Sequence, residues 1–311
     1  MNSLTTRMIK TLVMIGLFTG SAMAGSFSKS ARGTSSAQFL KFPTGARETA
    51  LGGAVTALSG DAGALAWNPA GLADVKKNNA LLSHSIGVEK TASSQGYYAH
   101  RTEQGTWGVG VSYFSPGTLD QTNFNGQTTG NFSPADWAGF LGYAHKWGNG
   151  SFGVAGKYIQ SKIIASDSTL ALDAGFLSPK FLGDRWQWGT ALKNLGGDLK
   201  VGPTANPLPL TLATGLSFSI LKGLTALADL DFPRDNTPIT SIGFEGEIVP
   251  ATEWELAYRA GWNSGVSRDL GGFAGLSTGL GLAHNGWTVD YAFSPLGDLG
   301  DTHRFSLSLD F

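Results

Sequence analysis

The chain has 311 residues, with 22 basic and 23 acidic side chains and no cysteine, a balance that argues against nucleic acid as a partner. Glycine reaches 44 residues, about 14% against a usual 7%, while charged residues are 14% against a usual 25%. Low charge with a mean hydropathy near zero is unusual for a soluble domain, but it suits a transmembrane β-barrel whose lipid-facing and lumen-facing residues alternate.

The first 24 residues have the three parts of a secretory signal peptide. Arg7 and Lys10 precede an apolar run from Thr11 to Gly20, and small residues follow as far as Ala24. Beyond this segment no stretch of about 18 apolar residues predicts a transmembrane helix. We therefore expect a cleaved signal peptide over residues 1–24 and an exported protein, either a secreted domain or a barrel of the bacterial cell outer membrane.

Residues 25–78 place small residues at helical spacing and show no period of two. The small residues run from 45 to 58, Ser59 to Asp61 offer a break and a cap, and residues 62–67 suggest a helical turn. Asn68 and Pro69 then provide another helix start, with proline in the first turn. Since helices rich in Ala and Gly are thin enough to fit inside a barrel, we predict an N-terminal plug segment over residues 25–78.

From about Asn79 onward, apolar and polar residues alternate in runs of about ten, the length that a tilted strand needs to cross an outer membrane. A β-sandwich or a β-solenoid also alternates, but a sandwich strand is typically about 5–6 residues long. We count fourteen runs, an even number, as in single-chain bacterial barrels. They are centred near residues 83, 98, 110, 142, 156, 172, 189, 215, 228, 243, 257, 277, 290 and 307.

The charges of these runs fall on one face. In the six clearest runs every ionisable residue shares a face, and the opposite face is apolar, which predicts a polar lumen and a lipid-facing exterior. Such charges have two possible roles. They pair with one another or with water and hold the plug, or they line a path for cations around it. The predicted lumenal charges in these runs are Asp229, Asp231, Glu253, Glu255, Arg259, Asp290, Arg304 and Asp310.

Connections between the runs also alternate in length. Tight turns such as Asn285-Gly286 are expected at one end, and longer loops (116–135, 196–208, 262–271 and 295–301) at the other, as in outer-membrane barrels. The terminal Phe311 closes an alternating strand and resembles the C-terminal signal by which the barrel assembly machinery recognises its substrates. A domain of residues 79–311 embedded in outer-membrane lipid is therefore predicted.

One N-terminal motif carries a family resemblance. The run from Phe42 to Ala54, with Gly60-Asp61-Ala62 and the stretch from Trp67 to Leu72, resembles the signature of the PorV/PorQ family within the FadL-like superfamily of outer-membrane barrels. The resemblance implies an all-β membrane protein, a 14-stranded antiparallel barrel with a short N-terminal helical plug in the lumen. It also implies plug or ligand roles for Asn68, Pro69 and Ala70, and we expect Arg47, Glu48 and Asp61 to help anchor the plug.

Three functions follow from these patterns. A PorV-like docking role for exported cargo proteins in a type IX-like secretion or surface-attachment pathway needs no lipid site, and the longest predicted loop, residues 115–135, is mostly polar. The alternative is a FadL-like transporter of small hydrophobic molecules such as fatty acids. A barrel enzyme is a distant third, because Gly275 to Gly279 matches a hydrolase elbow without its helix. The five histidines lack metal-ligand spacing, so no metal, cofactor or catalytic residue is predicted.

Overall fold

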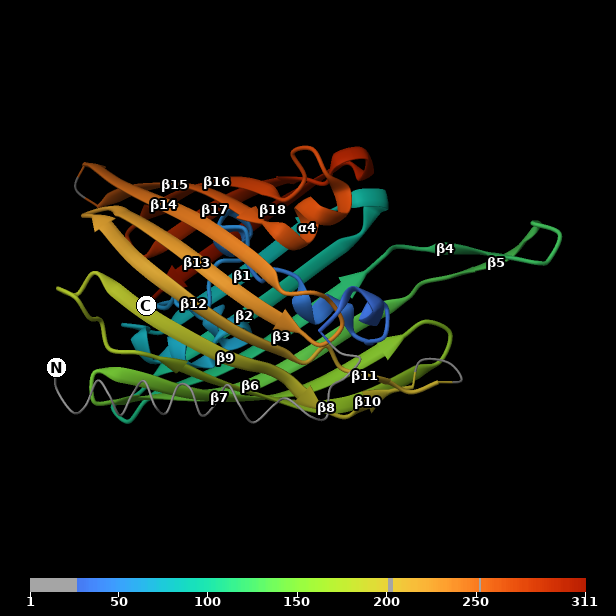
Figure 1. Ribbon diagram of the computed structural model, residues 1–311, viewed down its shortest axis with the longest axis horizontal. Helices are drawn as coiled ribbons and strands as arrows, with labels where there is room; N and C mark the ends of the chain where they lie inside the picture. Colours follow the sequence, from blue (N-terminus) through green and yellow to red (C-terminus); the bar gives the residue numbers. More distant parts are fainter. Residues whose placement is uncertain (1–26, 201–203, 252) are drawn as a thin grey trace.

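The computed structural model describes residues 27–200, 204–251 and 253–311, so the predicted signal peptide lies outside the described residues. Fourteen antiparallel strands form a closed barrel (Figure 1). The barrel strands are β1 (Asn79–Ile86), β2 (Ala92–Arg101), β3 (Thr106–Ser115), β6 (Ala135–Trp147), β7 (Gly150–Lys162), β8 (Ser166–Leu177), β9 (Trp186–Gly196), β12 (Thr211–Leu221), β13 (Leu224–Pro233), β14 (Ile239–Ala251), β15 (Trp254–Asn263), β16 (Leu276–His284), β17 (Trp287–Pro295) and β18 (Asp301–Asp310).

All fourteen predicted runs coincide with barrel strands, which confirms the predicted fold class. Consecutive barrel strands are neighbours, and β1 closes the ring by pairing with β18, from Asn79 opposite Asp310 to Ile86 opposite His303. The expected alternation of faces is also present. Along β16, for example, Ser277, Gly279 and Gly281 are buried toward the lumen, while Leu280 and Leu282 are exposed on the outside.

The two ends of the barrel differ. Short turns join most strands at one end, hereafter the turn end, where residues 148–149, 222–223 and 285–286 lie. The other, the loop end, carries the hairpin β4 (Leu119–Thr122) and β5 (Thr128–Phe132), the strand pair β10 (Asp198–Leu199) and β11 (Asn206–Pro207), α4 (Ser264–Leu270), η4 (Val88–Lys90) and η5 (Gly297–Leu299). The β4–β5 hairpin projects well beyond the barrel (Figure 1).

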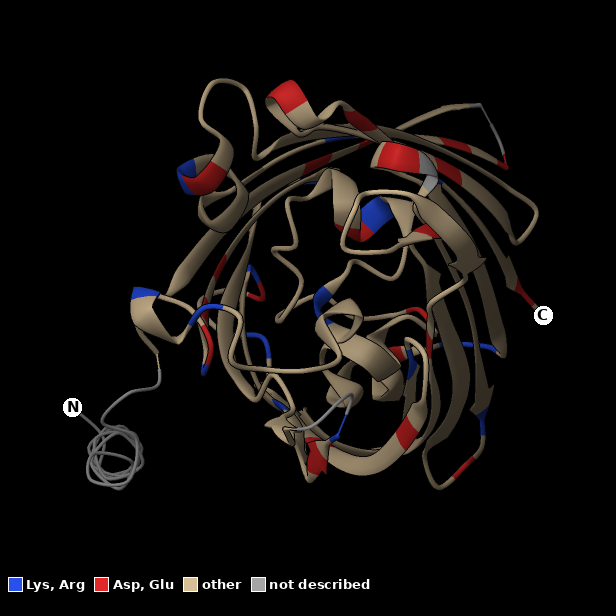
Figure 2. Ribbon diagram, turned by 90° about the vertical axis from the view of Figure 1, so that its right-hand side faces the viewer, with Lys and Arg blue, Asp and Glu red and all other residues tan. Residues whose placement is uncertain are grey.

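The segment before β1 fills the lumen (Figure 2). We call residues 27–78 the plug; it contains η1 (Lys29–Ala31), η2 (Gln38–Lys41), α2 (Ala46–Ala50), α3 (Ala64–Trp67) and η3 (Pro69–Asp74). It starts at the loop end, where the amide of Ser36 donates to the carbonyl of Pro207, and it reaches the turn end, where Asn78 bonds to Phe311. α2 contacts β15 to β18, and η3 contacts β6, β7 and β8.

The helical stretch expected over residues 45–58 is much shorter in the structure. α2 ends at Ala50, and Gly52 and Gly53 follow with φ of 66° and 82°, a left-handed conformation that favours glycine. The sharp turn brings the backbone of Gly52 against β15, where a Cβ on Gly52 would lie 2.6 Å from the amide nitrogen of Trp262. Contact with the barrel wall therefore overrides the helical spacing of the small residues.

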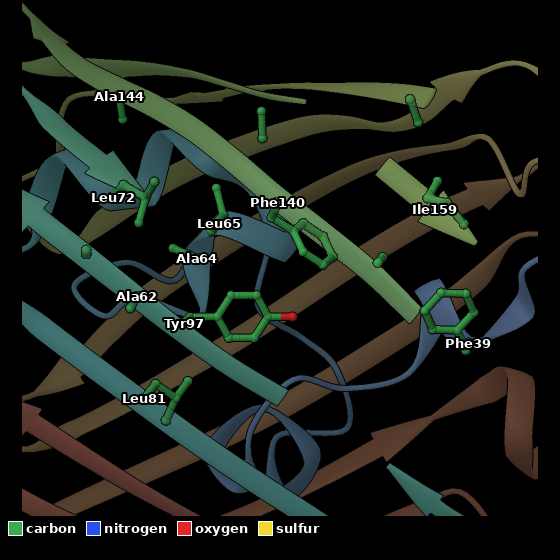
Figure 3. Packing of buried hydrophobic residues seen from close by; sticks show 14 of the residues in the cluster. Phe39, Ala62, Ala64, Leu65, Leu72, Leu81, Tyr97, Phe140, Ala144 and Ile159 are labelled. Atoms are coloured by element: carbon green, nitrogen blue, oxygen red, sulfur yellow. The ribbon is translucent and has the colours of Figure 1, made fainter. Parts of the chain in front are cut away.

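The plug packs on the wall through small wall residues and larger plug residues. Leu65 and Leu72 are fully buried against the wall, close to Phe140 and Ala144 of β6 (Figure 3). Eight lumenal glycines, each on a different strand, lie where a Cβ would come within 3.0 Å of plug atoms. These are Gly108, Gly142, Gly153, Gly175, Gly189, Gly243, Gly261 and Gly279. Part of the high glycine content thus provides the seat on which the plug rests.

Candidate functional site

The predicted motif Asn68-Pro69-Ala70 joins two parts of the plug to the wall. The side-chain amide of Asn68 donates to the carbonyls of Thr56 (2.7 Å) and of Phe176 in β8 (3.2 Å). Its carbonyl oxygen accepts from the amide of Ala70 (3.2 Å) and caps η3, which begins at Pro69. Asn68 is completely buried. Its three bonds therefore hold the middle of the plug against β8.

A charged network ties α2 to the opposite wall. Arg47 makes two hydrogen bonds to Glu245 of β14, at 2.7 and 2.8 Å, and lies 3.4 Å from Asp61 of the plug. Arg259 of β15 also bonds to Glu245 (2.6 Å) and reaches Asp290 of β17 (2.6 Å). The structure thus brings Arg47, Asp61, Arg259 and Asp290 together around Glu245, which the alternation of the strands also places on the lumenal face.

Glu48 lies beside this network and is only 2% exposed. Its Oε2 has no hydrogen-bond partner among the described residues. Burial raises the pKa of Glu48 to about 7, helped by the negative charges of Asp61 and Asp290 and opposed by Arg47. This carboxyl therefore changes charge near neutral pH, unlike an ordinary glutamate.

The other predicted lumenal charges are spread over the barrel. Asp229 of β13 accepts hydrogen bonds from the plug amides of Val55 (2.8 Å) and Thr56 (2.7 Å), so it is a further wall anchor. Arg304 bonds to Gln95 (2.9 Å) and Ser85 (3.2 Å) within the wall. Glu253 and Glu255 lie toward the turn end, Asp231 lies toward the loop end, and Phe311 is more than half exposed at the end of the closing strand.

A cavity of about 610 Å³ opens above the plug at the loop end; we call it the upper cavity. Its apolar lining comes from separate parts of the chain: Leu40, Phe42 and Pro43 of the plug, Val266 and Leu270 of α4, and Leu296. Its lining also includes Trp67 of α3, Lys193 of β9 and Asp231 of β13, which we call the floor residues. Lys41, at its edge, pairs with the buried Asp235 at 2.9 Å and holds this part of the plug in place.

The polarity of the longest predicted loop favoured the docking role, but it does not describe the loop end as a whole. That loop folds into the polar β4–β5 hairpin and projects away from the barrel (Figure 1). The apolar lining comes instead from the plug, α4 and the loop after β17. Each contributes only a few residues, so the sequence carries no apolar run that would mark the site.

Below α2 the lumen contains polar cavities. One of about 190 Å³ is lined by Arg47, Glu48, Asp61, Glu255 and Asp290, among others. A wider one of about 960 Å³ opens at the turn end and is lined by lysines and acids that include Lys76, Lys77 and Asp310. α2 and the chain that follows it thus separate an apolar compartment at the loop end from polar compartments at the turn end.

Sequence comparison gives one family and one relative. Residues 16–158 match the model of UPF0164, described as an uncharacterised protein family. A UPF0164 protein of Treponema pallidum (strain Nichols) is 26% identical over 235 residues, which are 67% of this chain and 55% of the relative. The chain therefore spans about half the length of the curated relative that it matches.

Solved structures are more informative about the fold. The toluene transporter TodX of Pseudomonas putida aligns with a TM-score of 0.58 at 13% identity, over 85% of this chain and 96% of that one. TbuX, a toluene transporter of Ralstonia pickettii, aligns with a TM-score of 0.58 at 13% identity, over 86% of this chain and 98% of that one. A FadL homologue of Pseudomonas aeruginosa aligns with a TM-score of 0.54 at 12% identity, over 86% of this chain and 98% of that one. The fold is FadL-like. The PorV/PorQ subgroup finds no support in these matches and stays a prediction.

Proposed function

We propose that this protein is an outer-membrane channel through which small hydrophobic molecules enter the cell. The observation that carries the proposal is the upper cavity, whose volume of about 610 Å³ lies in the range of ligand sites that enclose small molecules. A mostly apolar lining with a few polar groups is the usual composition of such sites. The similarity of the fold to that of two toluene transporters supports this choice over a docking role.

The outer surface of the barrel supports the membrane location. Large apolar side chains point outward on many strands and are about half exposed, among them Trp107, Val154, Leu172, Leu280 and Phe305. Soluble proteins rarely leave such a contiguous apolar surface in water. The predicted signal peptide is consistent with export across the inner membrane, and we infer an outer-membrane location.

A molecule in the upper cavity would have to pass α2 to reach the polar cavities below. The plug is held there by hydrogen bonds from Arg47 to Glu245 and from the amides of Val55 and Thr56 to Asp229. These bonds join the plug to side chains of the wall, so α2 can shift without breaking the backbone hydrogen bonds between the barrel strands. We infer that plug movement at α2 opens the route.

Uptake of labelled toluene into cells that produce the protein tests the proposal. Val266→Trp should fill the upper cavity from α4 and lower the uptake several-fold, because Val266 lines the cavity and lies outside the barrel wall. The matched control is Val109→Trp, which adds the same bulk on the exposed outer face of β3. Uptake equal to that of cells without the protein, or unaffected by Val266→Trp, would contradict a channel that uses this cavity.

A docking role in protein secretion is the second candidate, and the β4–β5 hairpin is the observation that favours it. The hairpin projects beyond the barrel (Figure 1), and Phe124, between β4 and β5, is fully exposed. If docking is the function, deletion of residues 119–132 should reduce the export of cargo proteins and leave toluene uptake unchanged. Unchanged export in the native bacterium after this deletion would remove the second candidate.

A further inference from the structure

Three side chains that line the upper cavity, the floor residues, differ from the neighbouring polar side chains in their lack of hydrogen-bond and ion-pair partners. They are Trp67 of the plug, Lys193 of β9 and Asp231 of β13. The ammonium of Lys193 lies 5.7 Å from the centre of the Trp67 ring, above its face. The three groups come from different elements and line the same cavity.

Neighbouring polar groups of the cavity are already satisfied within the protein. Asn194 accepts from Lys157 (2.7 Å) and donates to the carbonyl of Pro209 (3.1 Å). Asn263 donates to the carbonyl of Gly52 (3.1 Å) and to Ser241 (3.0 Å). These pairs fix the shape of the cavity and have little capacity left for a ligand.

The three floor residues lack such partners. Within residues 27–200, 204–251 and 253–311, the carboxyl of Asp231 makes no hydrogen bond; its Oδ1, like the indole nitrogen of Trp67, is closed off from the cavity, so Oδ2 is the atom left for a ligand. Lys193 forms no ion pair within 4.0 Å in the same ranges, and its contact with the Trp67 ring leaves its N–H groups available. A buried polar group without a partner is costly, and a ligand that supplies the partner removes the cost.

The charges decide which ligand suits this floor. A hydrocarbon leaves all three groups without partners. A carboxylate accepts from Lys193 but brings a second carboxyl group beside Asp231. An ammonium pairs with Asp231 but meets the charge of Lys193. A hydroxyl donates to Asp231 and accepts from Lys193, with no added charge.

We propose that the upper cavity selects neutral apolar molecules that carry one hydroxyl group, such as phenols and alcohols of similar size. The apolar body lies among Leu40, Phe42 and Leu270, and the hydroxyl points down to the floor between Lys193 and Asp231. The inference rests on the proposed function, because it names the class of molecule that the channel takes.

Four ligands on one ring test this selectivity: toluene, 4-methylphenol, 4-methylbenzoate and 4-methylbenzylammonium. Their binding to the purified full-length protein in detergent is measured by equilibrium dialysis. We expect 4-methylphenol to bind at least about tenfold more tightly than toluene, equivalent to about 1.4 kcal/mol. Both charged ligands should bind more weakly than 4-methylphenol.

Two variants identify the groups responsible. Asp231→Leu and Lys193→Met should each bring the affinity for 4-methylphenol down toward that for toluene, while toluene binds as well as before. The matched control, Lys162→Met, removes an exposed lysine on β7 outside the cavity and should change nothing. Because Lys193→Met and Asp231→Leu alter different strands, failure of one variant to fold leaves the other as a test.

The outcomes separate this inference from the proposed function. If toluene and 4-methylphenol bind equally and toluene is still taken up, the proposed selectivity for a hydroxyl group is wrong. The proposed channel function is not affected by that result. Tightest binding of the benzoate or of the ammonium also overturns it, in favour of an anion or a cation site. Binding of none of the four, together with no toluene uptake, contradicts the channel itself.

Discussion

Single residues on the barrel wall decide how closely the plug can approach. At Gly153 of β7 a Cβ would lie 2.3 Å from the carbonyl carbon of Pro69 and 2.4 Å from the amide nitrogen of Ala70. These are backbone atoms, so the clash cannot be relieved by rotating a side chain. The plug motif around Asn68 therefore depends on the absence of a side chain on the facing strand.

Gly153→Ala should displace the plug motif while the barrel stays folded. We expect ion conductance in planar bilayers to rise well above that of the wild-type protein, because the seat of η3 on β7 is lost. Gly156→Ala on the same strand is the matched control, since its nearest neighbour would be 4.0 Å away. Equal conductance of the two variants would show that the plug does not depend on this contact.

Glu48 makes the stability of the docked plug dependent on pH. Below its ordinary pKa of 4.5 the carboxyl is protonated whether the plug is docked or not. As the pH rises through the docked pKa of about 7, the buried group must ionise, so the stabilisation of the docked state is lost between these values. The difference corresponds to about 3 kcal/mol in favour of undocking at higher pH.

We therefore expect more frequent channel openings at about pH 8.5 than at about pH 5 in planar bilayers. Glu48→Gln, which is neutral at both values, should remain closed and lose the dependence on pH. Lys77→Gln, at the polar mouth of the turn end, is a control for general charge effects. The same pH dependence in Glu48→Gln as in the wild type would assign it to another group.

At the scale of an element, the last strand completes the barrel. Phe311 exchanges backbone hydrogen bonds with Asn78, at 3.0 and 3.1 Å, next to the ladder between β18 and β1. Its ring stacks on Tyr98 of β2, with 6.2 Å between the centroids. The terminal aromatic thus links the end of the chain to the first two strands from the lipid-facing side.

Phe311→Asp should lower the yield of assembled barrel, because it removes this stacking and places a charge on the lipid face near an interface. Placing the charge of aspartate near an interface lowers the stability of the folded barrel by only about 1 kcal/mol. We therefore expect the substitution to act mainly on the rate of assembly. The measurement is the fraction of membrane protein that migrates faster on a gel when the sample is not heated. Phe311→Tyr keeps the ring and should assemble normally; equal yields for both variants would rule out a role for the terminal aromatic.

For the whole molecule, the plug decides whether the barrel is closed. Fourteen strands enclose a lumen wider than the eight-stranded barrels that side chains alone can fill. The plug fills it by reaching from Pro207 at the loop end to Phe311 at the turn end. Without the plug, the lumenal charges of the wall would line an open, water-filled pore.

Removal of residues 25–76 should therefore give a barrel that still inserts and shows heat-modifiable migration but conducts ions continuously. The intact protein should be nearly closed in the same bilayers. The excess of acids among the lumenal charges further predicts that the open pore prefers cations. If the truncated barrel folds and stays closed, the plug is not what blocks the lumen.

The sequence alone determined the strands, their number and their faces, because the alternation of lipid and lumen along a strand is a local pattern. Asn68 and Pro69 could likewise be recognised as a helix start, and they begin η3. Only the tertiary structure decided that Arg47 and Arg259 share Glu245, because several lumenal carboxylates were equivalent as partners. It also formed the upper cavity, whose lining residues Leu40, Leu270 and Leu296 are far apart in the chain and each unremarkable in its own segment. Period and turn chemistry act between neighbours in sequence, whereas a cavity exists only once the barrel has closed around the plug.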